Sequence, residues 1–264
     1  MIKILIITSN HLRHKFFVNT LAKNYEVVGV VAEEKRPLPS SEIVEEDELM
    51  KSHFAGWQQK EKQYFGEYAN FVVPSEKVKF VERSQSNSPT MVEWIKSKNP
   101  DFVILFGSSI IKEPILSFFQ DRVINIHLGL SPYYRGSGTN FWPLVDNKPE
   151  CVGATIHLAV LDVDAGGILA QVRPQGVTPT DDSHDLGCKT IVAGAQKMVE
   201  VIEKYKQGLL KPQVQDLTKG EVYKRADFTA VDVRLVRKNL ASGMISQYLQ
   251  EKEARDKQYP IIEI

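Results

Sequence analysis

The sequence predicts an α/β fold: a Rossmann-like, open and mostly parallel sheet with helices on both faces, followed by a small C-terminal helical extension. Short runs of β-branched apolar residues recur along the chain, helix-like segments alternate with them, and polar residues directly follow several of the runs. A strand that is buried on both faces of a parallel sheet has such a continuous apolar run. The repeated order of strand and helix is typical of α/β domains.

The first half of the chain contains four predicted strands and the helices that connect them. We expect strands at residues 4–7, 27–31, 102–106 and 123–127, and helices at residues 12–23, 90–98 and 111–119. Ligands of such folds bind beyond the carboxyl ends of the strands. This rule places residues 8–13, 107–110 and 125–127 along one rim of the sheet.

Residues 33–68 interrupt this alternation. Residues 34–42 have the proline, serine and charged side chains of a loop, whereas residues 45–65 are charged and carry Phe54 and Trp57 at roughly helical spacing. We interpret the segment as a helical insertion, or lid, over the sheet edge. A solvated helix with one apolar stripe is the alternative.

The second half continues the sheet and then changes character. We expect strands at residues 152–160 and 168–172, and helices at residues 186–206 and 231–252. Gly208 is a suitable stop for the longer helix, and the composition turns polar beyond Pro212. We therefore predict a catalytic domain at residues 1–210 and a small extension at residues 211–264.

Composition narrows the classes of function. The 264 residues include 33 basic and 33 acidic side chains, and this balance does not suggest a nucleic-acid or membrane partner. Cys151 and Cys188 fit neither a metal-binding spacing nor a disulfide framework, which is consistent with a reducing compartment. The apolar start of the chain is too short for a signal sequence, and no run approaches a membrane span. We expect a cytoplasmic protein without a metal site.

The residues best suited to chemistry lie in the middle of the chain. Asn125 and His127 are two residues apart in a predicted strand, so their side chains share a face, and Asp164 follows in a glycine-containing segment. Transfer of an acyl-type group to an amine needs a donor near the oxygen that gains negative charge and a group that takes a proton from nitrogen. An amide, an imidazole and a carboxylate can supply both functions.

Each of these residues also has a structural explanation when it is considered alone. Asn125 could bond nearby backbone, His127 could be a packed core histidine, and Asp164 could be a turn aspartate that bonds its own backbone. We interpret His157 as a packed structural histidine and His184 as part of a helix cap.

The order of the motifs is more specific than any single residue. The chain carries Asn-x-His at 125–127, Ser-Pro-x-Tyr-Arg-Gly at 131–136, Gly-Ala-Thr-Ile-His at 153–157 and Asp-x-Asp-Ala-Gly at 162–166. Over about residues 76–175 this pattern resembles the folate-dependent formyltransferase family, which includes glycinamide ribonucleotide, methionyl-tRNA and nucleotide-sugar formyltransferases.

The resemblance implies a donor and a set of roles. A formyl group would arrive on 10-formyltetrahydrofolate, Asn125 and His127 would stabilise the oxyanion, and Asp164 would tune His127 and relay the amine proton. The candidates for folate binding, largely through backbone contacts, are Leu105, Gly107, Ser108 and Asp162.

Three features bear on the acceptor amine. The chain lacks room for the C-terminal barrel of the tRNA enzymes, it is longer than the minimal purine-pathway enzyme, and its residues 9–14 depart from the glycine-rich phosphate loop of the ribonucleotide enzyme. We expect a nucleotide-linked amino-deoxy sugar destined for a surface polysaccharide. The candidate acceptor-binding residues are Asn10, His11, Arg13, Tyr133, Arg135, Asn140 and Trp142.

Other functions stay open at this point. The closest are methionyl-tRNA formyl transfer and hydrolysis of formyltetrahydrofolate, in which water replaces the amine. A nucleotide-binding Rossmann protein without formyl transfer would carry Gly-x-Gly-x-x-Gly after the first strand, and residues 8–11 do not supply it. An apolar face on the last predicted helix is compatible with a homodimer.

Overall fold

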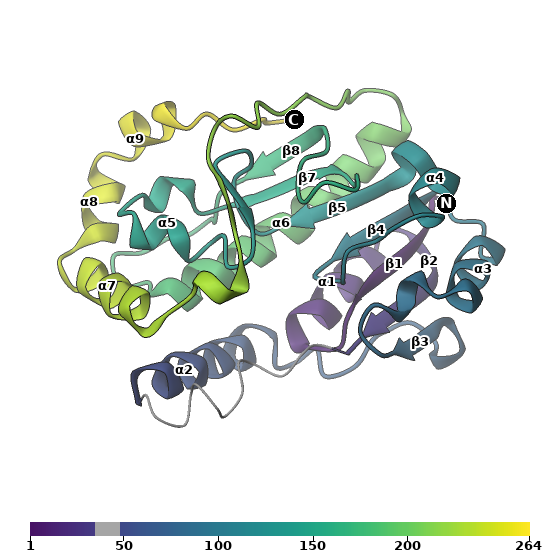
Figure 1. Ribbon diagram of the computed structural model, residues 1–264, viewed down its shortest axis with the longest axis horizontal. Helices are drawn as coiled ribbons and strands as arrows, with labels where there is room; N and C mark the ends of the chain where they lie inside the picture. The colour runs from purple at the N-terminus through teal and green to yellow at the C-terminus, as the bar shows by residue number, and fades with distance from the viewer. Residues whose placement is uncertain (35–47) are drawn as a thin grey trace.

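A seven-stranded sheet forms the centre of the molecule in the computed structural model, which describes residues 1–34 and 48–264 (Figure 1). Its strand order is β3-β2-β1-β4-β5-β7-β8, and only β7 runs antiparallel to its neighbours, so the predicted fold class is confirmed. The strands are β1 (Lys3–Ser9), β2 (Glu26–Glu33), β3 (Val78–Val81), β4 (Phe102–Phe106), β5 (Val123–His127), β7 (Ala154–Leu158) and β8 (Ile168–Val172).

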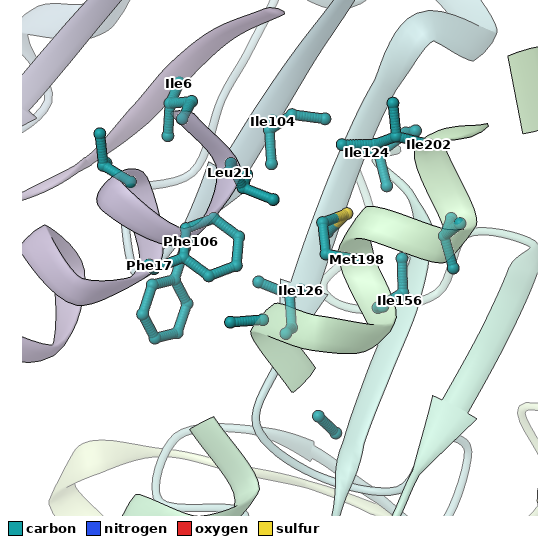
Figure 2. Packing of buried hydrophobic residues seen from close by; sticks show 14 of the residues in the cluster. Ile6, Phe17, Leu21, Ile104, Phe106, Ile124, Ile126, Ile156, Met198 and Ile202 are labelled. Atoms are coloured by element: carbon teal, nitrogen blue, oxygen red, sulfur yellow. The ribbon is translucent and has the colours of Figure 1, made fainter. Parts of the chain in front are cut away.

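Helices cover both faces of this sheet because successive residues of a strand point to opposite sides. In β1, Ile4 and Ile6 pack with α1 (Leu12–Ala22) and α6 (Ser183–Lys206), whereas Leu5 and Ile7 pack with α3 (Pro89–Ser97) and α4 (Ile115–Phe119). Figure 2 shows the first of these clusters, in which Met198 of α6 lies among isoleucines of the sheet. Burial on both sides explains why the strands read as continuous apolar runs.

The two ends of α6 follow from local chemistry. Asp182 accepts hydrogen bonds from the backbone nitrogens of His184 and Asp185, and Asp185 completes a capping box, so the helix begins three residues before the predicted Leu186. It ends at Lys206, and Gly208 follows with a positive φ of 72°, as predicted for a stop.

The described part of the segment at 33–68 contains one helix, α2 (Glu48–Phe65), which packs against α1, α6 and the extension. Residues 35–47, which include most of the predicted loop, lie outside the described residues. Arg13 at the start of α1 forms a buried ion pair with Glu61 of α2, with Nη1 and Oε2 2.8 Å apart. The helix is therefore fixed to the rim of the sheet and is not merely solvated.

The C-terminal extension is less regular than predicted. In place of one helix at residues 231–252 the structure has α7 (Ala230–Ala241), α8 (Met244–Gln250) and α9 (Lys252–Gln258). Gly243 separates the first two because it adopts a left-handed conformation with φ of 85°. The extension then returns to the sheet edge, where the backbone nitrogen of Gln171 donates to the oxygen of Ile262 over 2.7 Å.

Several short elements were not predicted. A two-stranded pairing joins β6 (Tyr134–Gly136) to β9 (Glu221–Tyr223) of the extension. The short helix α5 (Trp142–Val145) precedes β7, and α4 begins only after Pro114 rather than at Ile111. Elements of three to five residues carry too few periodic positions for the sequence pattern to detect them.

The described residues hold no candidate membrane span and no candidate metal-binding cluster. In residues 1–34 and 48–264, every helix is too short or too polar to traverse a lipid bilayer. Over the same residues, His, Cys, Asp and Glu side chains nowhere gather in threes as ligands for a metal ion.

Met198 tests the packing of α6 on the sheet. It is fully buried, and Met198→Ala should lower the free energy of unfolding by about 2–5 kcal/mol because it removes apolar contacts and leaves a cavity. Urea denaturation measures this change. Gln196→Ala, two residues away on the exposed side of α6, should stay within about 0.5 kcal/mol of wild type. Equal effects of the two substitutions would contradict the packing described.

Candidate active site

A cavity of about 1220 Å³ lies beyond the carboxyl ends of β1, β4 and β5. Its walls come from the segments that follow these strands, from α2, and from residues 222–228 of the extension. This is the rim that the topology predicts for a ligand site. Asn125, His127 and Asp164 all line it.

Asn125 and His127 lie at the end of β5 and share one face, as predicted. Asp164 lies in the segment between β7 and β8, and it meets both side chains. Its Oδ2 is 3.1 Å from Nδ1 of His127, and its Oδ1 is 3.4 Å from Nδ2 of Asn125. The structure therefore brings the three candidate catalytic side chains into direct contact.

The surroundings of His127 fix the role of each ring nitrogen. Nε2 lies 2.8 Å from the backbone oxygen of Tyr134, and a carbonyl oxygen only accepts, so Nε2 carries a hydrogen. The contact of Nδ1 with Asp164 is then attractive only when Nδ1 is protonated as well. Burial lowers the pKa of His127, and the charge of Asp164 opposes this effect. The carboxylate thus controls how readily the ring holds a second proton.

His157 is buried, as expected, but it also holds Asn125. The two residues face each other across the antiparallel β5–β7 pair. Nδ1 of His157 donates to the oxygen of Leu158 over 2.8 Å. When the ring carries its hydrogen only there, Nε2 accepts from Nδ2 of Asn125 over 3.0 Å, and the same Nε2 lies 3.5 Å from Oδ1 of Asp164. This bond sets the orientation of the Asn125 amide. The second hydrogen of Nδ2 makes only the long contact with Asp164 and remains available for a ligand oxygen.

The loop that carries Asp164 is held in an unusual conformation. Asp164 has φ of 50°, a left-handed conformation that aspartate adopts more readily than most residues. The backbone nitrogen of Gly136 donates to its Oδ2 over 3.0 Å, and Nε2 of Gln215 donates to its backbone oxygen over 2.8 Å. Burial alone would raise the pKa of Asp164, but the charge of His127, the contact with His157 and the hydrogen bond from Gly136 hold it below its ordinary value.

Gly136 is required where the extension meets the site. It has φ of 95°, and a β-carbon at this position would collide with the backbone oxygen of Tyr223. Pairing of β6 with β9 therefore depends on this glycine, and so does the placement of the nitrogen that bonds Asp164.

All four folate candidates, Leu105, Gly107, Ser108 and Asp162, line the cavity. Sequence reasoning missed Glu33, which orders the segment after β4. Its buried carboxylate accepts from the backbone nitrogen of Ser109 over 2.7 Å and from the Ser109 hydroxyl over 2.8 Å. Glu33 ends β2, two residues beyond the predicted strand, and it meets Ser109 because β2 and β4 both lie beside β1 in the sheet.

The acceptor candidates divide into two groups. His11, Arg13, Asn140 and Trp142 line the cavity, whereas Asn10, Tyr133 and Arg135 do not. Asn10 is exposed beyond β1, Tyr133 packs edge-on against Tyr259 at 5.1 Å between ring centroids, and Arg135 is buried beneath the extension, where it contacts the oxygen of Leu217.

One wall of the cavity carries residues that were not among the predicted site residues. It carries side chains of α2 and of the extension, including His53, Phe54, Tyr223 and Phe228. The ring of His184 joins them, so this residue does more than take part in a helix cap through its backbone. The aromatic residues of the insertion were the only sequence signal for this wall.

The comparison with protein families identifies the group to which this site belongs. A family model described as formyl transferase matches residues 12–202. The chain belongs to the formyl transferase family. The family assignment expected from the ordered motifs is confirmed, and the match includes Asn125, His127 and Asp164.

Two of the sequence relatives are methionyl-tRNA formyltransferases. A methionyl-tRNA formyltransferase from Thermodesulfovibrio yellowstonii is 32% identical over 140 residues, which cover 52% of this chain and 44% of the relative. One from Sulfurihydrogenibium sp. is 25% identical over 205 residues, which cover 76% of this chain and 58% of the relative. The chain thus spans about half the length of the curated relatives it matches.

Solved structures share the fold. A sugar N-formyltransferase from Shewanella sp. has a TM-score of 0.59 at 16% identity, covering 91% of this chain and 88% of that one. A phosphoribosylglycinamide formyltransferase from Anaplasma phagocytophilum has a TM-score of 0.56 at 16% identity, covering 85% of this chain and 98% of that one. An N-formyltransferase from Helicobacter canadensis, solved with folinic acid and dTDP-3-aminofucose, has a TM-score of 0.56 at 15% identity, covering 91% and 81%.

Proposed function

We propose that this formyl transferase moves a formyl group from 10-formyltetrahydrofolate to the amine of a nucleotide-linked amino-deoxy sugar destined for a surface polysaccharide. The observation that carries formyl transfer is the contact of Asn125, His127 and Asp164 at the floor of one cavity. These side chains combine an amide donor, a titratable ring and an ionised carboxylate, which acyl transfer to nitrogen requires.

The cavity walls near these residues suit the formyl donor. Leu105, Gly107, Ser108 and Asp162 all line the cavity, so backbone polar groups are available to a flat heterocycle. Ile110 and Leu161, which are 58% and 59% exposed, flank the same region. Exposed apolar side chains at a cavity rim fit the ring system of a folate. When bound, the folate would supply the formyl group.

The protein would act on the charges that develop during transfer. Nδ2 of Asn125 and the His127 ring would face the formyl oxygen as it becomes negative. Asp164, whose pKa is held low, would be ionised and would receive the proton that the attacking amine releases. The new bond joins the amine nitrogen to the formyl carbon, the bond from that carbon to the folate nitrogen breaks, and the folate nitrogen takes up a proton.

The size of the cavity supports a second, sizeable substrate. Its volume of about 1220 Å³ exceeds the range of roughly 300–1,000 Å³ typical of a site for a single drug-sized ligand. The Helicobacter canadensis enzyme binds folinic acid together with dTDP-3-aminofucose. A formyltransferase from Anoxybacillus kamchatkensis was solved with a UDP-linked formamido sugar and tetrahydrofolate. A nucleotide-linked sugar would account for the remaining space here.

Methionyl-tRNA is the second candidate acceptor, because the sequence relatives carry that name. Its support is weaker on two counts. The matched regions cover 44% and 58% of those two relatives. The chain also has a formal net charge of +0, whereas binding of tRNA rests largely on cations that meet its phosphates.

Substitution of the three central residues tests formyl transfer. Asn125→Ala, His127→Ala and Asp164→Asn should each lower kcat by about 10²–10³ because each removes a group that meets developing charge. Binding of folinic acid, measured by isothermal titration calorimetry, should change much less. Asp121→Asn, on the exposed surface outside the cavity, is the matched control. Near wild-type kcat in His127→Ala or Asp164→Asn would refute the assignment.

The acceptor can be identified by mass spectrometry of the products. The protein is incubated with 10-formyltetrahydrofolate and either dTDP-, UDP- or GDP-linked amino-deoxy sugars or initiator methionyl-tRNA. We expect at least one sugar to gain the mass of one formyl group, and we expect the Asp164→Asn variant to lose this product. Formylation of methionyl-tRNA with none of the sugars modified would overturn the sugar assignment and leave formyl transfer intact.

A further inference from the structure

We propose that the base of the nucleotide acceptor binds in an aromatic chamber formed by α2 and the extension, and that its diphosphate lies beside Lys224 and Arg225. The aromatic chamber is the part of the cavity lined by His53, Phe54, Phe141, His184 and Phe228. This inference rests on the proposed function, and it assigns the acceptor to residues that sequence reasoning did not select.

The rings of the chamber converge from separate elements. Phe228 of the extension lies 5.0 Å from Phe141, which precedes α5, and 5.5 Å from His53 of α2, measured between centroids. His53 lies 4.6 Å from His184 at the start of α6. All four side chains are half-buried, so each packs on its neighbours and still presents surface to the cavity. Aromatic surfaces of this kind stack on any nucleobase.

The histidines make the chamber suitable for an uncharged ring rather than a phosphate. Burial is the main reason that the pKa of His53 is lowered to about 4, and the nearby charges of His184 and Arg237 act in the same direction. His53 is therefore neutral at pH 7 and offers one hydrogen-bond donor and one acceptor. The edge of a nucleobase presents the complementary groups, whereas a diphosphate would favour a protonated imidazole.

The first turn of α1, which carries the acceptor candidate Arg13, already contacts a carboxylate. A helix N-terminus is an anion-binding site, and Glu61 of α2 fills it. Its Oε1 accepts from the backbone nitrogen of Arg13 over 3.1 Å, and its Oε2 pairs with the Arg13 guanidinium. The insertion thus places a carboxylate of its own at this turn, and that negative charge disfavours a diphosphate there.

Lys224 and Arg225 provide the alternative. Both are exposed, both line the cavity, and they lie between Tyr223 and Phe228 in the extension. Tyr223 fixes the start of this segment, because it stacks on Trp142 at 4.8 Å with an interplanar angle of 14°. Cations thus adjoin the aromatic chamber on the same segment of the extension, beside the ring on which a base would stack.

The two walls of the chamber are also joined to each other. Arg237 of α7 donates to the hydroxyl of Ser52 in α2 over 2.7 Å, and the two helices pack together. The insertion and the extension therefore form one acceptor-binding unit, while the sheet supplies Asn125 and His127. With this division, substitutions in the acceptor-binding unit could alter which acceptor binds while Asn125, His127 and Asp164 stay the same.

The test uses nucleoside diphosphates as probes, so that binding is measured without chemistry. Affinities of the full-length protein for dTDP, UDP, GDP, CDP and ADP are measured by isothermal titration calorimetry. Phe228→Ala and Phe228→Leu should each raise the Kd of the preferred diphosphate by about tenfold or more, since both remove the stacking surface. Phe228→Leu retains an apolar side chain, so a purely structural role would be rescued by it. Phe118→Ala, a half-exposed phenylalanine on α4, is the control and should leave Kd unchanged.

The charged residues are tested in the same way. Lys224→Ala/Arg225→Ala should raise Kd by about tenfold and weaken its dependence on salt, because counterions contribute less when these cations are absent. Lys219→Ala, an exposed lysine of the extension outside the cavity, is the matched control. With the sugar that wild type formylates, the larger share of each effect should fall on KM rather than kcat.

The outcomes separate this inference from the proposed function. If wild type formylates a nucleotide-linked sugar but Kd is the same in wild type and both Phe228 variants, the chamber assignment is wrong and the proposed function stands. If no sugar is formylated, the proposed function fails, and the titrations still decide the chamber. Weaker diphosphate binding by Phe228→Leu than by wild type would then support the chamber assignment. The absence of any diphosphate binding to wild type would overturn that assignment.

Discussion

The contact between the Asp164 carboxylate and the His127 ring is the interaction on which the rest of the site depends. It is attractive only when Nδ1 of His127 carries a proton, because Nε2 already donates to the oxygen of Tyr134. Burial works against a charged ring, and the ionised Asp164 works against burial. Asn125 completes the unit because His157 fixes its amide with Nδ2 toward Asp164. A buried polar cluster of this kind is rigid only when each of its polar groups has a partner, because an unpaired polar group costs free energy there.

That placement requires parts of the chain far from the sheet in sequence. Gln215 of the extension bonds the backbone of Asp164, and β9 of the extension pairs with β6, whose Gly136 donates to the carboxylate. On the other side of the cavity, Glu61 of α2 binds the first turn of α1. The insertion and the extension thus do more than enlarge a minimal domain. The insertion places a carboxylate at the first turn of α1, and the extension supports the loop that carries the Asp164 carboxylate.

The sequence predicted the parts that depend on local patterns. Apolar periodicity located the sheet strands β1, β2, β4, β5, β7 and β8, and the spacing of Asn125 and His127 placed them on one face of β5. It could not show that Asp164 bonds Gly136 or that His157 faces Asn125, because those contacts join residues 28 and 32 positions apart in the chain. It also did not reveal that Glu61 pairs with Arg13. The break at Gly243 required a backbone conformation that the apolar pattern of the last helix did not indicate.

The most direct test of this account is an NMR titration of the His127 ring in wild type, Asp164→Asn and Asp162→Asn, with histidine labelled in 15N and the signal assigned from His127→Asn. Replacing the Asp164 carboxylate with an amide removes the charge that stabilises the protonated ring, so the pKa of His127 should fall in Asp164→Asn. Asp162→Asn, two residues away and without an ion-pair contact to His127, should leave that pKa at its wild-type value. The same pKa in wild type and Asp164→Asn would show that the carboxylate does not control His127, and the account of the site would be wrong.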